Sequence, residues 1–135
     1  MKTQIYVNLP VKDLERSKAF FAQLGFSFNA QFTNEKAACM VVSDDIYVML
    51  LVESFFQTFT KKPVADATKT TEVLVCLSAE NREKVDDYVA KAVASGGKVP
   101  REPQDLGFMY SQAFEDPDGH IWELVYMDES AMAQA

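Results

Sequence analysis

Hydrophobic and polar positions along this chain follow an order of elements that occurs twice. Residues 4–9 alternate between polar and apolar, which is typical of a half-buried strand. After them, one residue in every three or four is apolar or small, which predicts an amphipathic helix that Asp13 caps and Gly25 ends. The positions on its inner face are Leu14, Ser17, Phe20, Phe21 and Leu24. Three strand-like runs follow at residues 26–32, 37–42 and 46–52.

The second occurrence starts with a strand-like run at residues 72–77. Either Ser78 or Asn81 caps the next helix, and Gly96 ends it. Three further strand-like runs cover residues 98–102, 109–114 and 120–127. The turn before the last run has the sequence Asp-Pro-Asp-Gly (residues 116–119), in which proline presets φ and glycine permits a positive φ.

The two halves align as an internal repeat. Ile46 and Ile121 are 75 residues apart (121 − 46), and the glycines that end the helices, Gly25 and Gly96, are 71 apart (96 − 25). The pattern predicts an α+β fold of two β-α-β-β-β modules, at about residues 1–53 and 72–128. Because neither half is long enough to bury a sufficient core alone, we expect both to form one domain over residues 1–135.

The connector, at about residues 54–71, carries Phe55, Phe56 and Phe59. Three phenylalanines need an apolar partner, which is either the domain edge beneath a short helix, a cleft beneath a flap, or a second subunit. The C-terminal residues 129–135 are small and polar, and we expect them to fray.

Composition narrows the function classes. The 135 residues are 48% hydrophobic and 24% charged, with a net charge of −7 and no basic cluster, which excludes a nucleic-acid or anionic-membrane partner. No signal-peptide pattern and no apolar run of the roughly 20 residues that span a bilayer are found, so a cytoplasmic location is predicted. Cys39 and Cys76 lie in apolar runs and are expected to be buried thiols.

Three stretches of the chain resemble the vicinal oxygen chelate superfamily. This superfamily includes glyoxalase I, bleomycin- and fosfomycin-resistance proteins, methylmalonyl-CoA epimerase and extradiol dioxygenases. The stretches are VNLPVKDLERSKAFF with LGF (residues 7–21 and 24–26), TEVLV (71–75) and FEDPDGHIWEL (114–124). Together with the repeat, the likeness covers nearly the whole chain. It is greatest to predicted glyoxalase I (lactoylglutathione lyase)-related proteins of unassigned substrate.

The resemblance implies that each module curls into a curved half-barrel and that the two line a cleft. In metal-binding members of the superfamily, the first and last strands of each module supply the ligands of a divalent metal. In the first module these positions correspond to Tyr6 and Val48, neither of which is a usual ligand. In the second they correspond to Leu74 (or Glu72, two residues earlier) and to Glu123, which matches the family's glutamate.

These four positions do not provide the usual ligands of a glyoxalase metal site. The only histidine, His120, lies at an odd spacing from Glu123 and so on the opposite strand face. It is either a turn residue that is hydrogen-bonded at the strand start or a catalytic base, and the first interpretation is favoured. A glyoxalase site with two histidines is therefore impossible in one chain. No cofactor is assigned, and only a weakly held divalent cation such as Mg²⁺, Mn²⁺ or Ca²⁺ suits Glu123 and Glu72.

Each candidate site residue has a structural and a functional interpretation. Glu123 is either a partner in an ion pair or the catalytic base or metal ligand on the cleft floor. Glu72 is either solvated or a second ligand. Tyr6, Asn8 and Tyr110 either pack in the core or bind a ligand in the cleft.

Two functions from different classes remain. One is a glyoxalase-like lyase, isomerase or dioxygenase acting on a small oxygenated metabolite, without ordinary glyoxalase I activity. The other is a metal-free protein that binds or sequesters a small molecule, of the bleomycin-resistance kind. In both cases the partner is a small molecule, and we expect a homodimer, because half-barrels leave open sheet edges.

Overall fold

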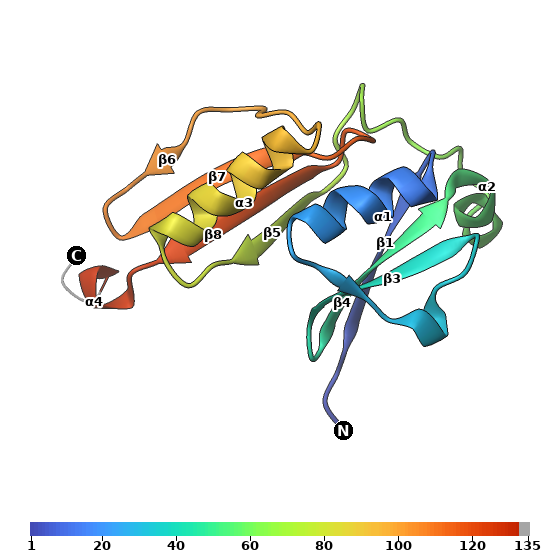
Figure 1. Cartoon of the computed structure of the whole chain (residues 1–135), viewed down its shortest axis with the longest axis horizontal. Helices are drawn as coiled ribbons and strands as arrows, with labels where there is room; N and C mark the ends of the chain where they lie inside the picture. The colour runs from blue at the N-terminus through green and yellow to red at the C-terminus, as the bar shows by residue number, and fades with distance from the viewer. Residues whose placement is uncertain (133–135) are drawn as a thin grey trace. The chain divides into compact units, whose positions relative to one another are not determined.

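Two open four-stranded sheets, each with one long helix against it, make up the computed structural model of this chain, which describes residues 1–132 (Figure 1). The chain divides into one unit at Met1–Asp66 and a second at Ala67–Ala135. The division falls inside the connector that the sequence predicts. Neither sheet closes into a barrel.

The first unit follows the predicted order of elements. Its strands lie in the order β1-β4-β3-β2, with β1 parallel to β4 and the other pairs antiparallel. The elements are β1 (Ile5–Val11), α1 (Leu14–Gln23), β2 (Ser27–Phe28), the 3₁₀ turn η1 (Ala30–Phe32), β3 (Ala37–Ser43), β4 (Ile46–Val52), α2 (Glu53–Phe56) and the 3₁₀ turn η2 (Gln57–Phe59).

Helix α1 begins and ends where its sequence predicts. The Asp13 carboxylate accepts a hydrogen bond from the backbone N–H of Arg16 at 3.1 Å, and Gly25 has a φ of 100° just beyond the helix. The buried side of the helix consists of Leu14, Ser17, Phe20 and Phe21. The short α2 and η2 contain the connector phenylalanines, of which Phe55 and Phe59 pack edge to face.

The second unit repeats this topology, with strand order β5-β8-β7-β6 and β5 parallel to β8. Asn81, and not Ser78, caps its helix, accepting from the N–H of Lys84 at 2.8 Å. The elements are β5 (Leu74–Ser78), α3 (Arg82–Ala94), β6 (Gln104–Asp105), β7 (Met109–Glu115), β8 (Ile121–Met127) and α4 (Glu129–Met132). Of the C-terminal stretch expected to fray, residues 129–132 form α4, and residues 133–135 lie outside the described residues.

The α+β fold of two repeated modules is therefore confirmed. Within residues 1–132, no helix has both the length and the apolar content required to span a bilayer.

Two of the predicted strands are wrong in extent. At residues 26–32, only Ser27–Phe28 pairs, because the Asn29 side chain accepts from the N–H of Gln31 and starts η1. At residues 98–102, no strand forms: Lys98 makes a single bridge to Glu115, and the pairing resumes only at β6. Pro100 has no N–H to donate to a ladder, which explains the interruption.

The two cysteines differ in burial. Cys39 is buried as expected, but Cys76 is exposed, so the prediction of two buried thiols is wrong for Cys76. The apolar run around Cys76 predicted burial on both faces of the strand, whereas β5 alternates between exposed and partly buried positions and Cys76 is one of the exposed ones.

The turn that joins β7 and β8 is held by hydrogen bonds to a buried carboxylate. Asp116 is 5% exposed and accepts three hydrogen bonds: from the indole N–H of Trp122 at 3.0 Å and from the backbone N–H groups of Asp118 and His120 at 2.9 and 3.0 Å. Gly119 follows with a φ of 89°. His120 is thus a turn residue, in agreement with its structural interpretation.

Candidate functional site

The sheet of the second unit has one face toward α3 and a second face, named the helix-free face because α3 does not cover it. Tyr110 and Gln112 of β7 bond to Asp86 of α3, so these even-numbered positions face the helix. Ala113 lies directly across from Glu123, and it is three positions along β7 from Tyr110 (113 − 110), an odd number. Since neighbouring residues of a strand point to opposite faces, Glu123 lies on the helix-free face.

A polar cluster occupies this helix-free face. The Arg101 guanidinium donates from Nη2 to the Oγ of Ser111 at 2.9 Å and to Oε2 of Glu123 at 3.2 Å. From Nη1 it also donates to the carbonyl oxygen of Glu102 at 3.1 Å. The side chains of Arg101 and Glu123 are 34% and 23% exposed, so both remain within reach of a ligand.

Cys76 lies beside this cluster, because β5 pairs with β8 in a register that places it opposite Glu123. Partial burial raises the pKa of the Cys76 thiol, the negative charge of Glu123 raises it further, and Arg101 lowers it. Cys76 is therefore a neutral thiol at neutral pH, which suits it to packing and weak hydrogen bonding and not to nucleophilic attack.

The sequence-predicted residues do not all gather around Glu123. Glu72 is exposed and precedes β5, which starts two residues after it. Tyr6 and Asn8 belong to the first unit, where Tyr6 is 47% exposed and stacks on Tyr47 with ring centroids 4.8 Å apart. The Asn8 side chain donates to the carbonyl oxygen of Tyr6 at 3.1 Å.

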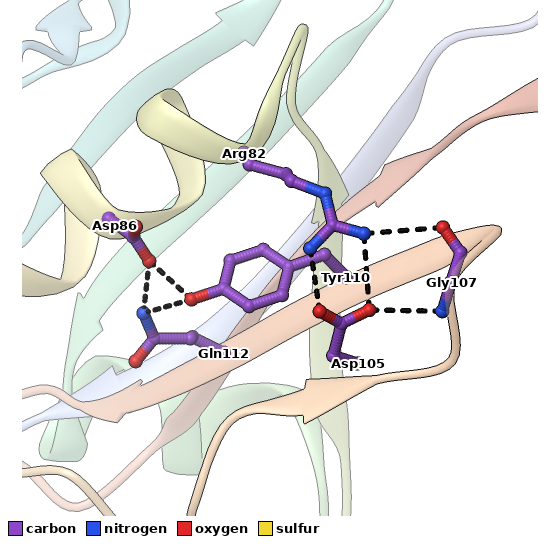
Figure 2. Close-up of polar contacts among 6 residues, drawn as sticks. All are labelled: Arg82, Asp86, Asp105, Gly107, Tyr110 and Gln112. Atoms are coloured by element: carbon purple, nitrogen blue, oxygen red, sulfur yellow. Dashed lines mark hydrogen bonds and ion pairs between the residues drawn. The ribbon is translucent and has the colours of Figure 1, made fainter.

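Tyr110 lies on the helix face, opposite to Glu123, in a separate polar network (Figure 2). Its hydroxyl donates to Asp86 and accepts from the side-chain amide of Gln112 at 3.0 Å. The guanidinium carbon of Arg82 lies 5.0 Å from the centre of the Tyr110 ring, a cation–π distance. The hydrogen bond to Asp86 is the main cause of the raised pKa of Tyr110.

Arg82 also holds the loop between β6 and β7 (Figure 2). It donates to both carboxylate oxygens of Asp105, at 2.8 and 3.1 Å, and to the carbonyl oxygen of Gly107 at 3.2 Å. The Arg82 bonds, with the N–H of Gly107, lower the pKa of Asp105 from 3.8 to about 2. The loop is thus tied to the first turn of α3.

The lowered pKa of Asp105 predicts how this tie depends on pH. A carboxyl group whose pKa is lower in the folded state stabilises the fold fully above its unfolded pKa, here 3.8, and loses that contribution as pH falls toward about 2. We expect the protein to melt higher than its Asp105→Asn variant at pH 5, and the two melting temperatures to converge near pH 2. A difference that stays constant over this range would show that the ion pair does not stabilise the fold.

Comparison with known proteins identifies the family. The family model described as "Glyoxalase/Bleomycin resistance protein/Dioxygenase superfamily" matches residues 3–124. The chain belongs to this superfamily. No curated protein matches it.

Solved structures of several other proteins have the same fold. A hypothetical protein from S. aureus is 30% identical over 93% of this chain and 94% of its own, with a TM-score of 0.79. A glyoxalase/bleomycin resistance protein/dioxygenase family enzyme from Burkholderia phytofirmans has a TM-score of 0.77 at 17% identity, covering 93% and 99% of the two chains. A fosfomycin resistance protein from Mesorhizobium loti has a TM-score of 0.68 at 15% identity, covering 98% of both. The last two likenesses show the fold alone.

The internal repeat of the sequence aligns Val48 with Glu123. In the structure this alignment of β4 with β8 is wrong by one residue. Val48 pairs with Val7 and Met40, and the side chains of Val48 and Met40 are 1% and 0% exposed. In burial Val48 matches Trp122 of the second unit, which is 1% exposed, and not the partly exposed Glu123. A bulge between Val41 and Ser43 shifts the pairing of the first hairpin by one residue. An alignment of β4 with β8 by their first residues therefore matches residues that point to opposite faces of their sheets. The residue equivalent to Glu123 is therefore Met49.

The side chains at the positions of the superfamily's metal ligands do not fit a divalent metal. Within residues 1–132, no three His, Cys, Asp or Glu side chains gather in a way that could hold an ion. Glu123 bonds to Arg101, a cation, and its equivalent Met49 is a thioether. One carboxylate paired with a guanidinium does not suit a divalent cation, and we derive no chemical step through a metal.

Sequence reasoning missed Arg101, Ser111 and the position of Cys76. The hydrophobic pattern places Arg101 in a strand that does not form. The pattern therefore does not indicate that the Arg101 side chain contacts Glu123. Ser111 carried one usable signal, a hydroxyl group in the strand directly before that of Glu123. A hydroxyl in an apolar strand calls for a partner, but the pairing register was needed to name it.

Proposed function

We propose that the protein binds a small oxygenated molecule at the Arg101–Ser111–Glu123 cluster, without a resident transition metal. The observation that supports this proposal is the cluster itself, a partly exposed ion pair on the face of the second unit's sheet that α3 does not cover. A guanidinium and a carboxylate side by side offer a ligand both hydrogen-bond donors and an acceptor. This is the kind of polar anchor that a small-molecule site needs.

The metal content of the purified protein tests the metal-free part of the proposal. We expect elemental analysis of protein purified without chelator to find well under one equivalent of transition metal. Glyoxalase I activity on the glutathione hemithioacetal of methylglyoxal should be absent. A stoichiometric metal that Glu123→Gln abolishes would contradict the proposal, because it would make Glu123 a ligand despite its bond to Arg101.

The same geometry supports a second candidate, a lyase or isomerase that enolises its substrate. The Glu123 carboxylate would take a proton from the carbon next to a carbonyl group, and the electron pair of the broken C–H bond would move to the carbonyl oxygen, where Arg101 would hold the charge. Where the carbon that loses its proton bears a hydroxyl group, the proton on Glu123 would return to the former carbonyl carbon. The hydroxyl proton would pass to the oxygen held by Arg101, so that a carbonyl group forms at the first carbon and the isomer is complete. Exchange of that hydrogen for solvent deuterium, lost in Glu123→Gln, would be its signature. A dioxygenase would need redox chemistry for which this donor set has no place.

We also propose a homodimer. Within its own sheet, β1 pairs only with β4, and β5 pairs only with β8, so each sheet has an edge with unused backbone groups. Light scattering at micromolar concentration should give about twice the 15.2 kDa of one chain. A mass equal to that of one chain would refute the dimer. The location that fits best is a reducing cytoplasm, because Cys39 and Cys76 are both unpaired.

A further inference from the structure

The hydrogen-bond capacity of the Arg101–Glu123 pair is only partly used. A guanidinium has five N–H donors, and Arg101 uses three, so Nε–H and one N–H of Nη1 have no acceptor among residues 1–132. Oε1 of Glu123 accepts no bond from the same part of the chain, since the Arg101 bond goes to Oε2. A ligand therefore meets unused positive and negative groups side by side.

The net charge of the Arg101–Glu123 pair favours some oxygenated ligands over others. Arg101 and Glu123 sum to zero charge, and a neutral pair accepts a ligand of zero net charge without leaving an uncompensated ion in a half-buried site. A simple carboxylate or hydroxy acid would leave one surplus negative charge next to Glu123, in a chain whose net charge is already −7. A zwitterion adds one group of each sign and lets each protein group keep a counter-charge.

From this geometry we infer that the ligand is a small zwitterion with the head group of an α-amino acid. Its carboxylate accepts from the unused N–H groups of Arg101, and its ammonium donates to Oε1 of Glu123. This inference rests on the proposed function, because it names the ligand class of the same cluster.

The surroundings of the cluster indicate an apolar amino-acid side chain. Leu74, Ile121 and Val125 share the helix-free face with Glu123, since Leu74 pairs with Ile121, and Val125 pairs with Ser111. Leu74 is 51% exposed, so covering it with an aliphatic group removes apolar surface from water. No further charged side chain bonds to the cluster within residues 1–132 to recognise a third ionic group.

Three matched probes test the ligand class. L-leucine carries both charges, 2-hydroxy-4-methylpentanoate keeps the carboxylate and the carbon skeleton but lacks the ammonium, and 3-methylbutylamine keeps the ammonium but lacks the carboxylate. Titration of ¹⁵N-labelled protein followed by NMR should show L-leucine shifting the amides of Cys76, Ser111 and Glu123. The other two probes should bind roughly tenfold or more weakly, because each loses a charge-assisted bond.

Variants separate recognition by the cluster from general charge effects. Arg101→Gln and Glu123→Gln should each weaken L-leucine binding by roughly tenfold or more. The control is Arg82→Gln, which breaks an arginine–carboxylate pair of the same chemistry on the helix face, and it should leave L-leucine binding unchanged. A circular-dichroism spectrum of each variant that matches the parent protein shows that the fold is intact.

The outcomes distinguish this inference from the proposed function. If the hydroxy acid shifts the same amides as tightly as L-leucine does, the zwitterion inference is overturned and the oxygenated-ligand proposal stands. If L-leucine shifts other amides only, or if Arg82→Gln weakens its binding as much as Arg101→Gln does, the inference is overturned as well. If none of the probes, fosfomycin or bleomycin perturbs the amides around Glu123, the result contradicts both proposals.

Discussion

Gly119→Ala is expected to destabilise the protein by at least about 3 kcal/mol and to lower its melting temperature by roughly 10 °C. Gly119 has a φ of 89°, which an L-residue adopts only with strain. An added Cβ would also lie 2.8 Å from both the carbonyl carbon and the oxygen of Ala67, and 2.9 Å from the Cα of Thr68. These are backbone atoms, so no side-chain rotation can relieve the overlap.

Gly25→Ala is the matched control for this prediction. Gly25 has a φ of 100° but no atom within 4 Å of the added Cβ, so it carries the backbone strain without the overlap. We expect it to cost about 1 kcal/mol, which urea unfolding followed by tryptophan fluorescence can measure. If Gly119→Ala and Gly25→Ala lower the free energy of unfolding equally, the close approach of Gly119 to the backbone of Ala67 is absent in solution.

Asp116→Ala is expected to cost about 3 kcal/mol, because it removes the acceptor from three N–H groups at a position that is 5% exposed. One of them is the indole N–H of Trp122, whose side chain is 1% exposed and stacks on Phe114. Trp122 is the only tryptophan, so its fluorescence reports the change directly.

Asp105→Ala serves as the comparison for Asp116. Asp105 also accepts several hydrogen bonds, including two from Arg82, but its side chain is 53% exposed, so water can replace the lost partner. At pH 7 we expect Asp105→Ala to destabilise the protein clearly less than Asp116→Ala does. A larger loss of stability in Asp105→Ala than in Asp116→Ala would contradict the conclusion that the Asp116 hydrogen bonds stabilise the fold more than those of Asp105.

The fold was predictable because its signals are local. Asp13 and Asn81 as caps, and Gly25 and Gly96 as helix ends, each act within a few residues, so the chain itself encodes the positions of α1 and α3. The prediction of a strand at residues 98–102 was wrong for an equally local reason. It followed the hydrophobic pattern and gave too little weight to Pro100, which has no N–H for strand pairing.

The site was only partly predictable, because it depends on pairing between distant residues. The sequence marks Glu123 as a carboxylate in an apolar strand, but its partner Arg101 lies 22 residues earlier in a stretch without regular structure. Tyr110 was expected near Glu123, yet lies on the other face, because the face of a strand residue depends on register that the sequence does not display. The bulge in the first hairpin hid the equivalence of Met49 and Glu123 in the same way.

The stretch that carries Arg101 is fixed at both ends and unpaired between them. Lys98 and Glu115 exchange backbone hydrogen bonds at 3.1 and 2.7 Å, and β6 resumes pairing at Gln104, which leaves residues 99–103 outside any ladder. Substitutions or changes of length there can move or remove the guanidinium without unpairing a strand. Ligand preference can therefore diverge among descendants of this scaffold, or in directed evolution, at a small cost in stability, and libraries that vary residues 99–103 are where new specificities should be sought first.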